Sequence, residues 1–129
     1  MQSEDLTDSP LARLGGTAGV DAVVDELYRR AGEDPELSGY FHTADMAAQR
    51  RRLADMIAGA LGGPPTPWIL GLDAAHRGRG ITHRHFSLMA AHLIDTLEHF
   101  GVRPDEADLL TEWFAAGRQA VVDGGPTAT

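Results

Sequence analysis

Apolar residues recur along the chain at the spacing of amphipathic helices. Between Thr17 and Gly32 they fall at i, i+3, i+4, i+7 and i+8, which places them on one helix face. This set comprises Val20, Val23, Val24, Leu27 and Tyr28. Thr17 is expected to cap the start of this helix and Gly32 to end it, because their residue types suit those positions.

Three later segments show the same periodicity. The first begins after Asp45 and stops at GGPPTP (62–67), since glycine and proline end helices. The second runs from a Thr82 cap to Gly101, and the third opens at Pro104 with acidic residues in its first turn. In the first segment the residues expected to be buried are Met46, Leu53, Met56, Ile57, Ala60 and Leu61. In the second they are Phe86, Met89, Ala90, Leu93 and Leu97. In the third they are Leu109, Leu110, Trp113, Phe114, Ala120 and Val121.

No segment alternates like a strand, so the pattern predicts an all-α protein. A short apolar stretch (68–76) precedes two glycines, and an acidic, turn-like stretch (34–41) ends in two aromatic residues. The length of 129 residues suits one domain, expected over 11–123, with a flexible leader (1–10) and a flexible tail (124–129).

Composition excludes several classes of function. A formal charge of −8 argues against nucleic-acid binding, which needs a basic face. The absence of cysteine removes disulfides, thiolate catalysis, zinc–thiolate sites and iron–sulfur clusters, and fits a cytoplasmic protein. No apolar run reaches the roughly 18 residues of a membrane span, and the polar start is unlike a secretory signal. In the run Arg50–Arg52, at least two side chains are expected on a solvated helix face.

The histidines differ in context. His85, His92 and His99 are seven residues apart, so neighbours lie about 10 Å from each other and cannot share one ion. They are expected to form a polar flank, and His83 in the first helical turn is expected to be exposed.

His76 follows the apolar stretch and precedes Gly78 and Gly80, which leave space beside the imidazole. A lone histidine in such a place is more often structural than a ligand. If His76 does bind a metal, it provides one protein bond, and a cofactor must supply the other ligands. Haem meets that requirement, because its porphyrin provides four nitrogens and a single histidine completes one side.

The landmarks of the chain, taken in order, resemble those of the truncated haemoglobins, group I in particular. They are Gly15-Gly16 before the first long helix, Tyr28 on it, Tyr40-Phe41 after it, LGGPP (61–65) at the end of the next helix, and AHRGRGIT (74–82) followed by His85-Phe86. This resemblance covers about residues 14–122. It implies a shortened globin fold, a two-over-two sandwich of helices around haem b.

The resemblance also implies the roles of individual residues. His76 would be the proximal iron ligand, and Tyr28 with Gln49 would form the distal hydrogen-bonding pair. An arginine would reach a haem propionate, with Arg52 the first candidate and Arg79 the second. The apolar wall of the pocket would comprise Phe41 against the porphyrin, Leu53 and Ile57 on the distal side, and Leu72, Ile81, Phe86 and Met89 on the proximal side. Each of these apolar residues also fits an ordinary hydrophobic core.

The resemblance therefore predicts reversible binding of dioxygen, with nitric oxide and carbon monoxide as further ligands. Leu53 stands where many members of the family have a second polar residue, so faster oxygen release is expected. Two alternatives remain open. One is enzymatic, a nitric oxide dioxygenase or weak peroxidase served by an unidentified reductase. The other is a haem-independent helical interaction module in which His76 is structural.

Overall fold

The computed structural model describes residues 9–41, 46–63, 80–118 and 122. No strand occurs among them, so the all-α prediction is confirmed for this part of the chain. The elements are α2 (Pro10–Leu14), α3 (Gly16–Glu33), the 3₁₀ helix η1 (Ser38–Phe41), α4 (Met46–Ala60), α6 (His83–His99) and α7 (Pro104–Ala116). None of these helices is long and apolar enough to cross a bilayer.

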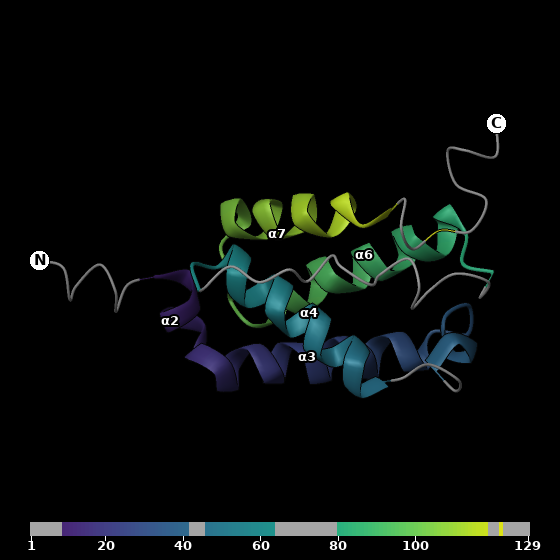
Figure 1. Ribbon diagram of the computed structural model, residues 1–129, viewed down its shortest axis with the longest axis horizontal. Coiled ribbons are helices and arrows are strands. Elements are labelled where there is room, and N and C mark those ends of the chain that lie inside the picture. Colours follow the sequence, from purple (N-terminus) through teal and green to yellow (C-terminus); the bar gives the residue numbers. More distant parts are fainter. Residues whose placement is uncertain (1–8, 42–45, 64–79, 119–121, 123–129) are drawn as a thin grey trace, which may run out of the picture.

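The four long helices pack as two crossed pairs (Figure 1). Helix α3 contacts α4 and α6, while α7 contacts the same two helices from the opposite side. The short helix α2 packs against α3 at its N-terminal end. This arrangement is the two-over-two sandwich that the resemblance implies.

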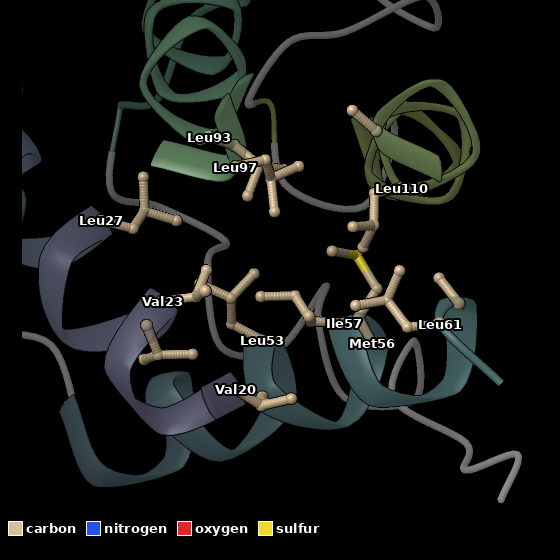
Figure 2. Packing of buried hydrophobic residues seen from close by; sticks show 13 residues of the cluster. Val20, Val23, Leu27, Leu53, Met56, Ile57, Leu61, Leu93, Leu97 and Leu110 are labelled. Carbon is tan, nitrogen blue, oxygen red and sulfur yellow. The ribbon is translucent and has the colours of Figure 1, made fainter. Parts of the chain in front are cut away.

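The core lies where the four helices meet, and Figure 2 shows its side chains converging there. Helix α3 contributes Val20, Val23, Val24 and Leu27, which confirms the predicted apolar face. The other helices add a larger set of buried side chains. These are Leu53, Met56, Ile57 and Ala60 of α4, Leu61 just after it, Leu93 and Leu97 of α6, and Ala107 and Leu110 of α7.

Two boundaries and several positions expected to be buried differ from the predictions. Among the latter, Met46, Met89, Ala90, Trp113 and Phe114 are only half-buried, while Ala120 and Val121 lie outside the described residues. Thr17 does not cap α3, because the chain leaves α2 through a left-handed Gly15 (φ 111°) that itself precedes the first helical residue. At the other end the helix continues past Gly32 to Glu33. Leu109, predicted to be buried, is 39% exposed because it lies on the outer side of α7.

Polar contacts join the corner after α3 (residues 34–40) to the start and middle of α6. His92 Nε2 lies 2.8 Å from Asp34 Oδ2, and the Arg84 guanidinium donates two hydrogen bonds of 2.8 Å to Glu36. The hydroxyl oxygen of Tyr40 lies 3.1 Å from His85 Nδ1. The predicted polar flank on α6 therefore has a defined role, because two of its histidines attach α6 to this corner.

The approach of α2 to α3 requires glycine at position 19. A Cβ built on Gly19 would overlap the Leu14 carbonyl, with its carbon only 2.6 Å away. Alanine normally favours a helix over glycine by about 1 kcal/mol, but here the clash dominates. We expect Gly19→Ala to lower the free energy of unfolding by about 1–3 kcal/mol, the usual cost of overpacking, in urea titrations followed by circular dichroism.

Gly32→Ala in the same helix is the matched control. No atom lies within 4 Å of a Cβ built there, and Gly32 is helical. This substitution should stabilise the protein by up to about 1 kcal/mol. Equal effects of the two substitutions would contradict the close contact between α2 and α3.

Surface carboxylates held by cations make stability depend on acid pH. Hydrogen bonds from Arg29 and Arg30 lower the pKa of Glu26 from 4.5 to about 2. The pKa values of Asp34 and Glu36 are also lowered, chiefly by hydrogen bonds that their carboxylates accept from His92 and Arg84 respectively.

A lowered folded-state pKa contributes stability that is complete above the unfolded-state pKa and lost as pH falls towards the folded value. We therefore expect the urea midpoint to fall between about pH 5 and pH 2. Glu26→Gln should flatten this fall relative to the parent protein. An identical pH profile for both proteins would show that the pairing of Glu26 does not contribute.

Candidate functional site

Tyr28 lies in the second half of α3, on the edge of the apolar face. Its side chain is half-buried and packs against the core. Burial raises its pKa to about 12, although the charges of Arg50 and Arg52 act in the opposite direction. Tyr28 is therefore a neutral phenol at physiological pH and can donate a hydrogen bond.

The three consecutive arginines of α4 have three different environments. Arg51 is exposed, as expected for a solvated face. Arg50 forms an ion pair with Asp25 and places its guanidinium carbon 5.3 Å from the centre of the Tyr28 ring. Arg52 is half-buried, and its Nη1 atom is inaccessible to solvent without a hydrogen-bond partner among the described residues.

The expectation that at least two of the three lie on a solvated face holds, because Arg51 is exposed and 41% of the Arg50 side chain is exposed. Helix α4 packs on α3, and this turns positions 50 and 52 towards the tyrosine-bearing end of α3. Sequence periodicity does not specify which helix α4 crosses. The pairing of Arg50 with Asp25 was consequently missed, although Asp25 and Tyr28 stand three residues apart and so share a face of α3.

The other predicted distal residues occupy the inner side of α4. Gln49 is half-buried, one turn before Leu53. Leu53 is 8% exposed and Ile57 is fully buried, and both belong to the core cluster. Figure 2 shows them among side chains of α3 and α6. Tyr28, Gln49 and Arg52 therefore border an apolar region.

Among the predicted proximal residues, Ile81 and Phe86 are buried, and Met89 is half-buried against the core. The Phe86 ring stacks on Phe114 with centroids 4.7 Å apart, and the Arg118 guanidinium carbon lies 4.4 Å from its centre. Much of the surface of Phe86 is therefore already in contact with α7 and the residues that follow it.

A hydrogen-bonded cluster holds the start of α6. Thr82 caps the helix by accepting from the His85 backbone N–H, and the Thr82 backbone N–H donates to His85 Nδ1 at 3.1 Å. The Tyr40 hydroxyl donates to the Gly80 carbonyl oxygen at 3.1 Å. This cluster fixes the chain four residues after His76, whose own placement lies outside the described residues.

Leu72 and Arg79 also lie outside the described residues, and Phe41 is placed only as the last residue of η1. Within the described part of the chain, no group of three histidine, aspartate or glutamate side chains could hold a metal ion.

Comparisons with known proteins agree with this geometry. The family model described as bacterial-like globin matches residues 11–122. A group 1 truncated haemoglobin of Mycolicibacterium paratuberculosis is 39% identical over 90 residues, which are 70% of this chain and 66% of that protein, just under two thirds of its length. The group 1 truncated haemoglobin of a Synechocystis species is 33% identical over 97 residues, covering 72% of this chain and 78% of that one.

A solved structure supports the same assignment. The crystal structure of a Synechococcus 2/2 haemoglobin, described as having covalently attached haem, superposes with a TM-score of 0.70. Its sequence is 28% identical, and the match covers 88% of this chain and 98% of that one. The chain therefore belongs to the bacterial-like globin family, as a truncated haemoglobin with the two-over-two fold, and the cofactor of that family is haem.

Proposed function

We propose that the protein binds haem b through His76 and binds dioxygen reversibly, with Tyr28 and Gln49 on the distal side. The observation that carries this proposal is the position of Tyr28. A neutral phenol on α3 stands at the edge of an apolar core formed with α4, and α4 carries a half-buried amide, Gln49, one turn before the core residue Leu53. Such a pocket provides a few placed donors within apolar surroundings, as small-ligand sites do.

Arg52 tests whether the residues of this chain fit haem. Its Nη1 atom is buried without a hydrogen-bond partner among the described residues, and such an atom costs free energy unless it is paired. Haem carries two propionate carboxylates, and arginine binds carboxylates strongly. Leu53 keeps 8% of its surface exposed and could meet an apolar face of haem, because burying apolar area is worth about 25 cal/mol per Å², whereas Ile57 is already fully buried in the core. The residues present therefore fit the group.

The chain contributes polarity and shape to the proposed site. Haem supplies an iron centre at which diatomic gases bind. The Tyr28 hydroxyl would donate a hydrogen bond to dioxygen, which becomes partly negative when bound, and the Gln49 amide would provide a second donor. Leu53 is apolar and nearly buried, so α4 offers no further amide one turn beyond Gln49. We expect this smaller network to release oxygen faster than a pocket with two amides.

Nitric oxide dioxygenation and a reductase partner stay predictions from the resemblance. The described residues include no feature that favours turnover over reversible binding. Binding is therefore the function proposed here, and it requires only the pocket side chains and the proximal histidine.

Reversible oxygenation of the haem-loaded protein tests the proposed function. The reduced protein should show one absorption spectrum under argon and another in air, and repeated gas exchange should interconvert the two. Immediate irreversible oxidation in air would contradict reversible binding, and the absence of a Soret band after haem addition would favour the haem-independent module.

Tyr28→Phe should accelerate oxygen dissociation about tenfold, the effect of losing about 1.4 kcal/mol of hydrogen bonding. The ring and its packing remain in this variant, so the change isolates the hydroxyl. Stopped-flow mixing of the oxygenated protein with carbon monoxide gives the rate. An unaltered rate would remove Tyr28 from the distal role.

His76→Ala should abolish the proximal iron–histidine bond, because this residue is the only one that the resemblance assigns to that role. Resonance Raman spectra of the reduced protein report the iron–histidine stretching band, which should disappear. His83→Ala is the matched control, since His83 is exposed on α6 and should leave the band unchanged. Persistence of the band without His76 would refute the assignment.

A further inference from the structure

Arg50 links the two helices that carry the proposed distal residues. Its guanidinium carbon lies 5.3 Å from the centre of the Tyr28 ring, within the range of a cation–π contact. The same guanidinium pairs through Nη1 with Asp25 Oδ1 of α3. Because Asp25 precedes Tyr28 by three residues, both lie on one side of α3, and Arg50 is attached to each.

These contacts have little value as stabilisers of the fold. The Arg50 and Asp25 side chains are 41% and 68% exposed, and exposed ion pairs contribute at most about 1 kcal/mol. An exposed cation–π contact adds about 0.5–1 kcal/mol. The two contacts together orient the Arg50 side chain. The ion pair with Asp25 holds one end of the guanidinium, and the guanidinium lies over the Tyr28 ring.

A cation at this place also acts on the chemistry of the phenol. A nearby positive charge stabilises the phenolate form and therefore makes the phenol more acidic. A more acidic O–H group is a stronger hydrogen-bond donor. Among the charged groups that act on Tyr28, Arg50 has the largest effect and Arg52 the second. Both residues belong to α4, so the packing of α4 on α3 brings these positive charges close to the Tyr28 ring.

We propose that Arg50 is a positioning residue for Tyr28: held by Asp25, its guanidinium fixes the phenol ring and strengthens its hydroxyl as a donor to a bound diatomic ligand. This inference rests on the proposed function, because it assigns Arg50 to the same distal site. It differs from a merely structural bridge between helices, which would affect stability and leave ligand release unchanged.

Oxygen dissociation from the haem-loaded protein tests the inference. Arg50→Gln removes the charge and keeps a polar side chain, and it should accelerate dissociation about two- to fivefold, the range that an exposed cation–π contact supports. Arg50→Lys keeps a cation near the ring and should restore most of the parent rate. Arg51→Gln, which removes the same charge from the exposed neighbouring position, is the matched control and should leave the rate unchanged.

The Tyr28→Phe background separates action through Tyr28 from any other effect. In that background Arg50→Gln should cause no further acceleration. Equal acceleration in the presence and absence of the Tyr28 hydroxyl would overturn the inference, as would an effect of Arg51→Gln as large as that of Arg50→Gln.

A second readout does not depend on ligand kinetics. The chain contains two tyrosines, so a protein labelled with carbon-13 at tyrosine Cζ should give two resonances in the carbon monoxide complex. Arg50→Gln should shift the Tyr28 resonance. The Tyr40 resonance, from a hydroxyl bonded to Gly80, should stay in place as an internal control. An unmoved Tyr28 resonance would show that Arg50 does not act on this ring.

The outcomes distinguish the two proposals. If Tyr28→Phe itself leaves oxygen dissociation unchanged, the distal role of Tyr28 fails, and this inference fails with it. If Tyr28→Phe accelerates dissociation and Arg50→Gln does not, the proposed function stands and only the role of Arg50 is overturned.

Discussion

Helix α4 lies across α3 because each has an apolar face that the other buries, and the remaining features of the site depend on this contact. Val20, Val23 and Leu27 of α3 meet Leu53 and Ile57 of α4 in one core. This packing also brings together polar residues at the margins of the two faces. No local sequence pattern predicts that these polar residues lie close to one another. The half-buried phenol, the cation over its ring and the buried Arg52 nitrogen, which has no hydrogen-bond partner in the described part of the chain, all lie at this margin. Their chemistry follows from how the helices cross.

The rest of the fold restrains both ends of this crossing. After α3, Asp34 and Glu36 are paired with side chains of α6, and Tyr40 bonds to Gly80 just before α6 begins. The corner after α3 is thereby attached to the chain that follows His76 in sequence. The Arg84–Glu36 pair is exposed, and exposed pairs are individually weak. Acting at successive positions, these contacts favour one arrangement of the corner relative to α6.

Sequence periodicity predicted the helices well because burial imposes its own spacing. Val20 to Leu27, and Leu93 with Leu97, stand where the pattern placed them, and Thr82 and Pro104 begin their helices as expected. Predictions failed where the answer depends on a neighbouring helix. Thr17 does not cap α3 because Gly15 takes a left-handed conformation there, and Leu109 faces outward. The contact of Arg50 with Tyr28 was not predicted at all. The roles of His76, Leu72 and Arg79 stay predictions, because these residues lie outside the part of the chain that the structure describes.

The central claim is that haem lies against the α3–α4 margin with Tyr28 on one of its faces. Nuclear Overhauser contacts in the reduced carbon monoxide complex test it directly, because they report which protein protons lie within a few ångströms of the porphyrin. We expect contacts from the haem to the Tyr28 ring and to the Leu53 methyl groups. Contacts confined to other helices, with none to Tyr28 or Leu53, would contradict the account.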